Sequence, residues 1–395
     1  MSRAKKLPEP TPEAKAHSEK LSKKIQSYLK RHKSMLFSQF MHQALYTPNL
    51  GYYSAGLPKF GRSGDFITAP EISPIFSRCV ARQAAQVLKE LEQGCIVEFG
   101  AGTGAMAEAI LLELDELAQL PEIYYILEVS ADLKARQQER LRCALSEEVF
   151  AKVRWLDKLP STPINAVMLA NEVLDAMPCE RIKIEPDQAL QGYVYFNETS
   201  QQFDWDYQPI TDRYLQSFSN QLIKHIGKVS DLGYETEINL NIRPWLKSLY
   251  QVLKNGMVLL IDYGYSREEY YQPARVMGTL RCHYQHRAHQ NPFFYPGLQD
   301  ITAHVDFTAV AENAFDKGFK VAGYTTQANF LMGSGLMEMS VDPNAEIEQQ
   351  IRTAQQIKTL TMPDEMGESF KVIALTKNID SQLMGFSIRD LRNQL

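Results

Sequence analysis

Residues 95–104, CIVEFGAGTG, combine an apolar run with glycines at positions 100, 102 and 104. Ile96–Phe99 predicts a buried parallel strand, and the apolar, helix-forming residues Ala105–Leu117 predict the helix that follows it. Glycine at 100 and 102 permits a sharp turn and a close approach of the backbone to a ligand, which a Cβ prevents. The stretch therefore predicts a nucleotide-cofactor loop at the end of a strand.

The glycine spacing alone leaves two cofactor classes open. Gly100, Gly102 and Ala105 also satisfy the dinucleotide pattern, in which the third small residue is sometimes alanine. Glu98 favours S-adenosylmethionine (SAM), because a carboxylate two residues before the first glycine attracts an ammonium group and repels a pyrophosphate. SAM is therefore the preferred cofactor.

Two more predicted strands end in acidic residues. Ile123–Val129 contains Glu128, near the offset at which a Rossmann-like fold places the carboxylate that binds the ribose hydroxyls. Val153–Asp157 ends in Asp157, for which we weigh two roles: accepting a hydrogen bond from the adenine amino group, or lying exposed in a loop.

A fourth and a fifth strand carry the candidate catalytic residues. Ala166–Glu172 leads into Asn171, Glu172 and Asp175, and Met257–Asp262 ends in Asp262. Ligands of open α/β sheets lie beyond the carboxyl ends of the strands, so these side chains are expected near the substrate. Capping of a following helix is the less favoured alternative, which would explain Asn171 and Asp175 without catalysis.

Length and composition fit one catalytic core with additions. The chain has 395 residues, 44% of them apolar, with a net charge of −5 and a pI near 6.0. This charge gives no electrostatic case for nucleic acid. The five cysteines form no Cys-x-x-Cys pair, which indicates a reducing compartment, and no apolar run is long enough to span a bilayer.

We expect five segments along the chain. Residues 1–20 are predicted to be a disordered tail, 21–92 a helical cap, 93–178 the SAM-binding core, 179–250 an inserted lid, and 251–395 the remaining core with an active-site loop at 278–307. In the insertion, Glu180–Glu185, Gly192–Asn197 and Gln202–Tyr207 alternate as antiparallel strands do, and helices follow at Leu215–Ile226 and Leu240–Leu253. The basic but acid-containing N-terminus predicts a bacterial cytoplasmic protein, mitochondrial only if this segment is a transit peptide.

Several blocks together resemble one family, the MidA-like protein-arginine methyltransferases associated with assembly of respiratory complex I. They are FMHQALYTPNLGYY (40–53), GDFITAPEIS (64–73), VEFGAGTG (97–104), NEVLDAMP (171–178), IDYG (261–264), TLR (279–281) and PGLQDITAHVDF (296–307). The resemblance spans residues 35–376.

The resemblance implies a class I, Rossmann-like α/β fold with a seven-stranded sheet, SAM as cofactor, and methylation of an arginine in a partner protein. By this likeness Gly100, Gly102 and Gly104 contact the cofactor, Glu128 binds its ribose, and Asn171 and Glu172 lie at the methyl-transfer end. Asp65 and Glu71, in the 64–73 block, are expected to close over the cofactor, although capping of a short helix also explains Glu71.

The acceptor chemistry requires carboxylates. An arginine guanidinium stays cationic and delocalised, so a bidentate carboxylate is needed to orient it and to draw charge from the reacting nitrogen. Glu172 is our first choice, Asp175 and Asp262 the next, and His304 a hydrogen-bond partner near the methyl group or a structural residue.

Two further classes of protein and a metal site compete with this prediction. The protein is alternatively a SAM-binding assembly factor without turnover, or an NAD-dependent dehydrogenase on the same topology. Cys282, His283, His286 and His289 are crowded enough to suggest zinc, but Arg281 and Arg287 oppose a cation there, and we expect no metal.

Overall fold

The computed structural model describes residues 7–55, 67–186, 188–227, 233–340 and 345–395. The chain forms two compact units, each assembled from several stretches of sequence. Unit 1 contains residues 1–66, 175–241 and 268–304, and unit 2 contains residues 67–174, 242–267 and 305–395. Each unit is described by itself below.

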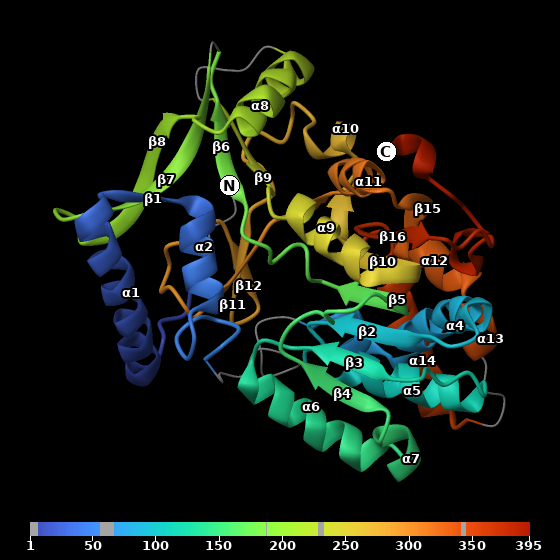
Figure 1. The fold of residues 1–395 in the computed structure, drawn as a ribbon. Coiled ribbons are helices and arrows are strands. Elements are labelled where there is room, and N and C mark those ends of the chain that lie inside the picture. The colour runs from blue at the N-terminus through green and yellow to red at the C-terminus, as the bar shows by residue number, and fades with distance from the viewer. Residues whose placement is uncertain (1–6, 56–66, 187, 228–232, 341–344) are drawn as a thin grey trace. The chain divides into compact units, whose positions relative to one another are not determined.

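Unit 2 is built on a mixed sheet, which confirms the predicted α/β class. Its strands follow the order β15-β16-β10-β5-β2-β3-β4, and β14 pairs with β10 beside this path (Figure 1). All neighbours from β10 to β4 are parallel, whereas β16 runs antiparallel between β10 and β15. The strands are β2 (Cys95–Phe99), β3 (Tyr124–Leu127), β4 (Val153–Leu156), β5 (Ile164–Asn171), β10 (Leu253–Tyr265), β14 (Val305–Asp306), β15 (Lys320–Thr326) and β16 (Phe370–Lys377).

Helices pack on this sheet through apolar faces. Helix α4 (Pro74–Leu91) buries Phe76, Val80 and Val87 in the main core and begins at Ser73, whose hydroxyl accepts a hydrogen bond from the Ile75 N–H. The predicted helix after the glycines is α5 (Ala105–Glu116). The other helices are α3 (Ala69–Ile72), α6 (Ala131–Ala144), α7 (Glu147–Phe150), α9 (Ile242–Val252), α11 (Phe307–Lys317), α12 (Gln327–Gly333), α13 (Leu336–Met339) and α14 (Ile347–Thr361).

Unit 1 contains two antiparallel sheets. The predicted strands of the insertion are confirmed as β6 (Glu180–Ile184), β7 (Ala189–Asn197) and β8 (Gln202–Pro209), and the first predicted helix as α8 (Arg213–Ile226). Two further strands of this sheet were not predicted from the sequence, β1 (Ser34–Leu36), which pairs with β7, and β9 (Tyr234–Ile238), which pairs with β6, and neither were the three strands of the small sheet. The small sheet consists of β11 (Arg281–Tyr284), β12 (Arg287–His289) and β13 (Asp300–Thr302), and the short helix α10 (Arg267–Tyr270) begins in unit 2.

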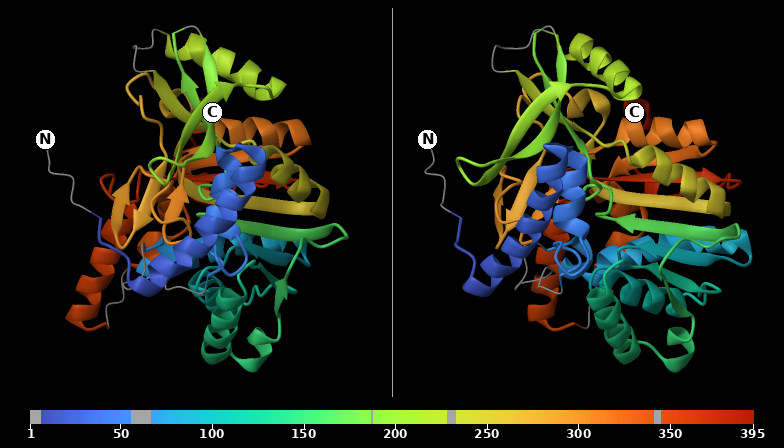
Figure 2. Two further views of the ribbon diagram at one scale, coloured as in Figure 1. Left: turned by 90° about the vertical axis from the view of Figure 1, so that its left-hand side faces the viewer. Right: turned by 60° about the vertical axis from the view of Figure 1, so that its left-hand side comes forward.

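The N-terminal helix begins earlier than predicted. Helix α1 (Pro12–His32) lies beside α2 (Phe37–Tyr46) (Figure 2), so the prediction of a disordered tail to residue 20 is wrong from Pro12 onward. Proline at a first helical position has the right φ and lacks only an N–H that would be unpaired there, so Pro12 starts the helix rather than breaking it. Ser18 is buried and donates a hydrogen bond to the Pro296 carbonyl. The part of the tail at residues 1–6 lies outside the described residues.

Within the described residues, none of the helices combines the length and the apolar character that crossing a bilayer requires.

Candidate functional site

The glycine loop joins β2 to α5 and has the backbone that the sequence predicts. Gly100, Gly102 and Gly104 all have positive φ, at 63°, 54° and 86°, a region that side-chain-bearing residues adopt only with strain. Gly104 is the N-cap of α5 and provides no side chain to cap it. The loop therefore leads into a helix N-terminus without a side-chain cap, with glycine where a ligand needs the backbone to be accessible.

Glu98 lies on β2 beneath this loop, and it is almost completely buried. Its carboxylate accepts a hydrogen bond from the Tyr124 hydroxyl at 2.7 Å. Burial and the neighbouring charge of Glu128 raise the pKa of Glu98 to about 7, although the Tyr124 hydrogen bond acts in the opposite direction. A cationic group placed beside Glu98 would recover the charged form.

Glu128 follows β3 and is also buried. One carboxylate oxygen accepts a hydrogen bond from the Ser130 N–H at 2.9 Å, and the other accepts one from the Gln137 side-chain amide at 3.0 Å. The same amide of Gln137 also binds the Gly102 carbonyl at 2.9 Å. The structure thus brings the ribose-binding candidate and the glycine loop together through one side chain.

Asp157, after β4, lies at the surface. Its side chain is 90% exposed and forms an ion pair of 3.2 Å with Lys134. This environment matches the exposed loop aspartate that we weighed against an adenine contact.

Asn171 and Glu172 stand at the carboxyl end of β5, which neighbours β2 in the sheet. Glu172 has a positive φ of 52°, and its N–H binds the Ile261 carbonyl at 2.9 Å. The Asn171 amide nitrogen donates to the Glu172 carboxylate at 3.3 Å, whereas its buried oxygen accepts no hydrogen bond from the described residues. A Cβ added at Gly100 would lie 3.6 Å from Val173, so this turn runs beside the glycine loop.

Asp262 holds this turn in place. It is fully buried on β10, and its two carboxylate oxygens accept hydrogen bonds from the Leu174 N–H at 3.0 Å and the Tyr263 N–H at 2.9 Å. No helix follows β5 before β6 in the described residues, so capping of a helix does not explain Asn171 or Asp175. Asp262 thus has a positioning role in the structure.

Glu71 reaches the glycine loop from α3. Its carboxylate accepts a hydrogen bond from the Thr103 hydroxyl, and Arg140 of α6 donates to the same hydroxyl at 3.2 Å. The hydroxyl of Thr68, the N-cap residue of α3, makes no capping hydrogen bond, so Glu71 is engaged with the loop instead of with a capping box. Asp65 lies outside the described residues.

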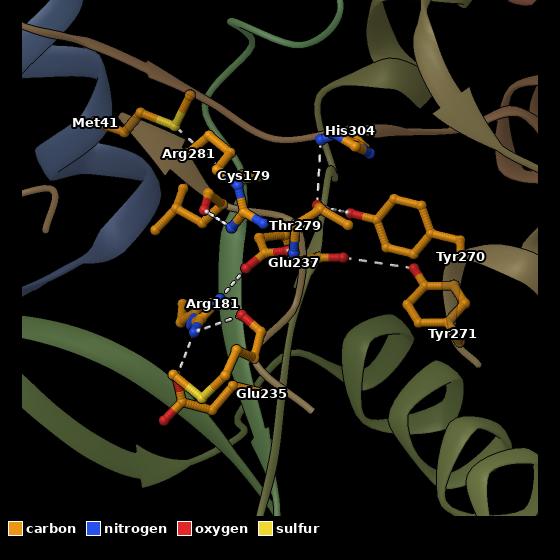
Figure 3. A network of polar contacts seen from close by, with 12 residues as sticks. Met41, Cys179, Arg181, Glu235, Glu237, Tyr270, Tyr271, Thr279, Arg281 and His304 are labelled. Carbon is orange, nitrogen blue, oxygen red and sulfur yellow. Dashed lines mark hydrogen bonds and ion pairs between the residues drawn. The ribbon is translucent and has the colours of Figure 1, made fainter. Parts of the chain in front are cut away.

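Asp175 and His304 belong to unit 1. The Asp175 carbonyl accepts a hydrogen bond from the Ala303 N–H at 3.0 Å, which ties the two segments together. Figure 3 shows that the His304 backbone N–H binds the Thr279 hydroxyl, at 3.2 Å, and that the same threonine binds the buried carboxylate of Glu237, which pairs with Arg181. This network fixes the start of the 278–307 loop.

The residues considered for zinc do not form a metal site. Cys282 and His283 are successive residues of β11, so their side chains point to opposite faces. In the described part of the chain, no group of three or more His, Cys, Asp or Glu residues is placed to hold a metal ion.

The arrangement of unit 2 fits an adenosyl cofactor with a cationic end. The loop glycines keep the backbone open, and two buried acids lie near them, Glu98 on the strand before the loop and Glu128 after the neighbouring strand β3. The Asn171 oxygen is a buried acceptor. Tyr124, Gln137 and Arg140 were not predicted from the sequence. Gln137 had a readable signal, because it interrupts the apolar stripe of α6 between Leu133 and Leu141.

Comparisons with known proteins agree with this geometry. A family model of S-adenosyl-L-methionine-dependent methyltransferases matches residues 79–325. A crystal structure from Burkholderia thailandensis, bound to S-adenosyl-homocysteine, is 37% identical, covers 99% of this chain and 100% of its own, and superposes with a TM-score of 0.93.

Two curated relatives carry a more specific name. The protein arginine methyltransferase NDUFAF7 homolog, mitochondrial, of Drosophila melanogaster is 26% identical over 94% of this chain and 88% of its own length. The protein arginine methyltransferase NDUFAF7, mitochondrial, of Danio rerio is 25% identical over 86% and 82%.

Proposed function

Because this chain belongs to the family of SAM-dependent methyltransferases, we propose that it methylates an arginine side chain of a partner protein. SAM is its cofactor. Two observations support an arginine acceptor: the likeness to the two protein arginine methyltransferases along most of the chain, and the carboxylate of Glu172 in the turn that runs beside the glycine loop.

Named residues of unit 2 would hold the cofactor. The backbone of Gly100, Gly102 and Gly104 would face the cofactor. The Glu128 carboxylate would accept hydrogen bonds from the ribose hydroxyls, and Glu98 would pair with the ammonium group. Bound SAM supplies an electrophilic methyl group on a sulfonium. The Asn171 oxygen offers a further acceptor at the same edge of the sheet.

Glu172 would orient the acceptor. A carboxylate that accepts two N–H bonds from a guanidinium fixes the plane of the group and draws positive charge away from the nitrogen that faces the methyl. The positive φ of Glu172 supports this role, since strained backbone at a non-glycine residue gathers at functional sites. Asp262 would act indirectly, because its carboxylate binds the Leu174 N–H and so holds the turn that carries Glu172.

The remaining sequence predictions enter as parts of this proposal. Segment 179–250 would serve as the lid and substrate subdomain, with Asp175 and His304 contributed by the same unit, and Asp65 and Glu71 would close over the cofactor. Asp157 as an adenine contact and the cytoplasmic location stay predictions.

Label transfer tests the proposal. The pure protein is incubated with methyl-labelled SAM and a cell lysate, and methylated arginine is sought by mass spectrometry. We expect labelled arginine from the native chain and a loss of roughly 100-fold or more with Glu172→Ala. Glu122→Ala removes an exposed acid before β3, at the other end of the strand from the loop, and should leave transfer unchanged.

Two results would decide against the proposal. Binding of SAM with no label on any protein favours the assembly factor without turnover, and full transfer by Glu172→Ala removes the role of that carboxylate.

A further inference from the structure

Gln137 is a fully buried amide in the middle of α6. Its neighbours one turn away on the buried face, Leu133 and Leu141, are apolar, so leucine at 137 would continue the stripe. Burying an amide without hydrogen bonds is costly, and a polar residue at such a position needs well-placed partners. Gln137 has three, one bonded to its oxygen and two to its nitrogen.

The partners fix one orientation of the amide. The Trp155 indole N–H donates to the Gln137 oxygen at 3.0 Å, and an indole nitrogen is only a donor. The Gln137 nitrogen must then face the other two groups, the Gly102 carbonyl at 2.9 Å and the Glu128 carboxylate at 3.0 Å, which are both acceptors. A flipped amide would lose all three hydrogen bonds, so Trp155 on β4 sets the direction in which Gln137 donates.

The position of Gln137 relates two parts of the cofactor site. One amide group binds a carbonyl of the glycine loop and a carboxylate that follows the next strand. A Cβ added at Gly104 would lie 3.5 Å from Gln137, so the loop also packs against this residue. The separation between loop and carboxylate is therefore set by one rigidly held side chain.

We propose that Gln137 is a positioning residue that holds the Glu128 carboxylate for the ribose hydroxyls of the cofactor. This inference rests on the ribose role of Glu128 in the proposed function. A neutral amide orients the carboxylate and leaves its negative charge in place. A lysine or arginine at position 137 would neutralise that charge. It also supplies no cation for a phosphate on the ribose, so the site selects a ribose with free hydroxyls.

Calorimetry of S-adenosyl-homocysteine binding to the full chain tests the role of Gln137. Gln137→Met keeps an unbranched side chain of similar size without the amide, and we expect roughly tenfold weaker binding. Gln83→Met is the matched control, because Gln83 is equally buried in the same unit and bonds Gln86 and the Gly385 N–H, away from the glycine loop. It should lower the melting temperature without changing the affinity.

Two further readouts separate positioning from a loss of structure. The effect of Gln137→Met should be smaller in a Glu128→Gln background, where only the contact with the Gly102 carbonyl still depends fully on the amide, and it should shrink for an S-adenosyl-homocysteine analogue that lacks the ribose hydroxyls. If Gln137→Met weakens binding equally in both backgrounds, or for both ligands, the inference is wrong.

The outcomes also distinguish the inference from the site on which it rests. Unchanged affinity in Glu128→Gln would remove the ribose role of Glu128. Weakened affinity in Glu128→Gln with unchanged affinity in Gln137→Met would refute only the inference. If Gln137→Met does not fold, Trp155→Phe replaces it, because this change removes the indole N–H that orients the amide and keeps an aromatic ring at the position. A smaller, Glu128-dependent loss is then expected, and an unchanged affinity would overturn the inference.

Discussion

The carboxylate of Glu98 and the hydroxyl of Tyr124 form a buried hydrogen bond of 2.7 Å between two adjacent parallel strands, β2 and β3. Both side chains are excluded from solvent. Burial raises the pKa of Glu98 to about 7 and also raises the pKa of Tyr124 well above its ordinary value. The hydroxyl therefore keeps its proton and remains a donor, while the carboxyl group titrates near neutral pH.

The first prediction concerns stability without ligand. Between pH 4.5 and 7 an unfolded Glu98 has lost its proton whereas a folded one retains it, so the free energy of unfolding falls as the pH rises. The shifted pKa of Glu98 contributes roughly 3 kcal/mol to the free energy of unfolding, and this contribution is fully present below pH 4.5 and lost above pH 7. Urea unfolding at several pH values should show a shallower decline for Glu98→Gln, because glutamine does not titrate but still accepts the hydrogen bond from Tyr124.

Glu90→Gln is the control for this experiment, because Glu90 is exposed on α4. Its pH profile should follow that of the native chain. Identical slopes for the native chain and Glu98→Gln would contradict the prediction.

The second prediction concerns cofactor affinity. If Glu98 pairs with the ammonium group of SAM, binding requires the ionised carboxylate and releases a proton near neutral pH. From pH 6 to 7.5 the ionised fraction of a group with a pKa of about 7 rises roughly eightfold, and the association constant should rise with it. Calorimetry on the native chain and on Glu98→Gln measures this, and the variant should bind weakly with a flat profile. A flat profile for the native chain would place the ammonium elsewhere.

The third prediction concerns the glycine loop. Gly102→Val forces a β-branched residue to a φ of 54° and puts a side chain where the cofactor is expected, so SAM binding should be lost. Gly227→Val is the matched control, since Gly227 has a φ of 74° at the end of α8 and open space around a Cβ. Both variants should lose stability from backbone strain, by about 1–3 kcal/mol. Only the first should lose SAM in an equilibrium binding assay, and equal affinities would contradict the role of the loop.

The fourth prediction concerns the buried ion pair of Arg181 and Glu237 in unit 1. Arg181→Met leaves Glu237 buried without its cation, which should destabilise the protein by about 3–5 kcal/mol. Adding Glu237→Gln removes the uncompensated charge and keeps an acceptor for the Thr279 N–H and hydroxyl. The double variant should therefore recover much of the stability that Arg181→Met loses. Chemical denaturation of both variants measures the difference. A double variant no more stable than Arg181→Met would show that the charge itself is not the cause.

Local patterns were enough to predict the frame of unit 2 and its loop. Apolar runs predict β2, β5 and β10, and the glycines at 100–104 predict the turn after β2. These predictions succeed because each signal lies within a few neighbouring residues. Asn171 is the last residue of β5, whereas β10 continues beyond Asp262 to Tyr265. The role of Asp262 depends on Leu174, a residue far away in the chain, whose N–H donates to its carboxylate. The burial of the Asn171 oxygen likewise results from the packing of segments that are distant in the sequence.

Other features depend on contacts that a sequence does not show. Strand β9 forms because Tyr234–Ile238 pairs with β6, about fifty residues earlier, and its own residues alternate weakly between polar and apolar. The early start of α1 depends on Ser18 and Leu21 finding partners in unit 1. The sequence shows Gln137 as a polar residue that interrupts an apolar stripe. Its three hydrogen-bond partners, however, come from separate segments of the chain and cannot be predicted from that pattern.

The chain passes between the two units at residues 66/67, 174/175, 241/242, 267/268 and 304/305. A unit made of three stretches has no single pair of cleavage points that would release it whole, and neither unit can be expressed by simple truncation. Changing the acceptor specificity of this protein would therefore require redesign of individual loops within the full chain, because neither unit can be replaced as one continuous segment.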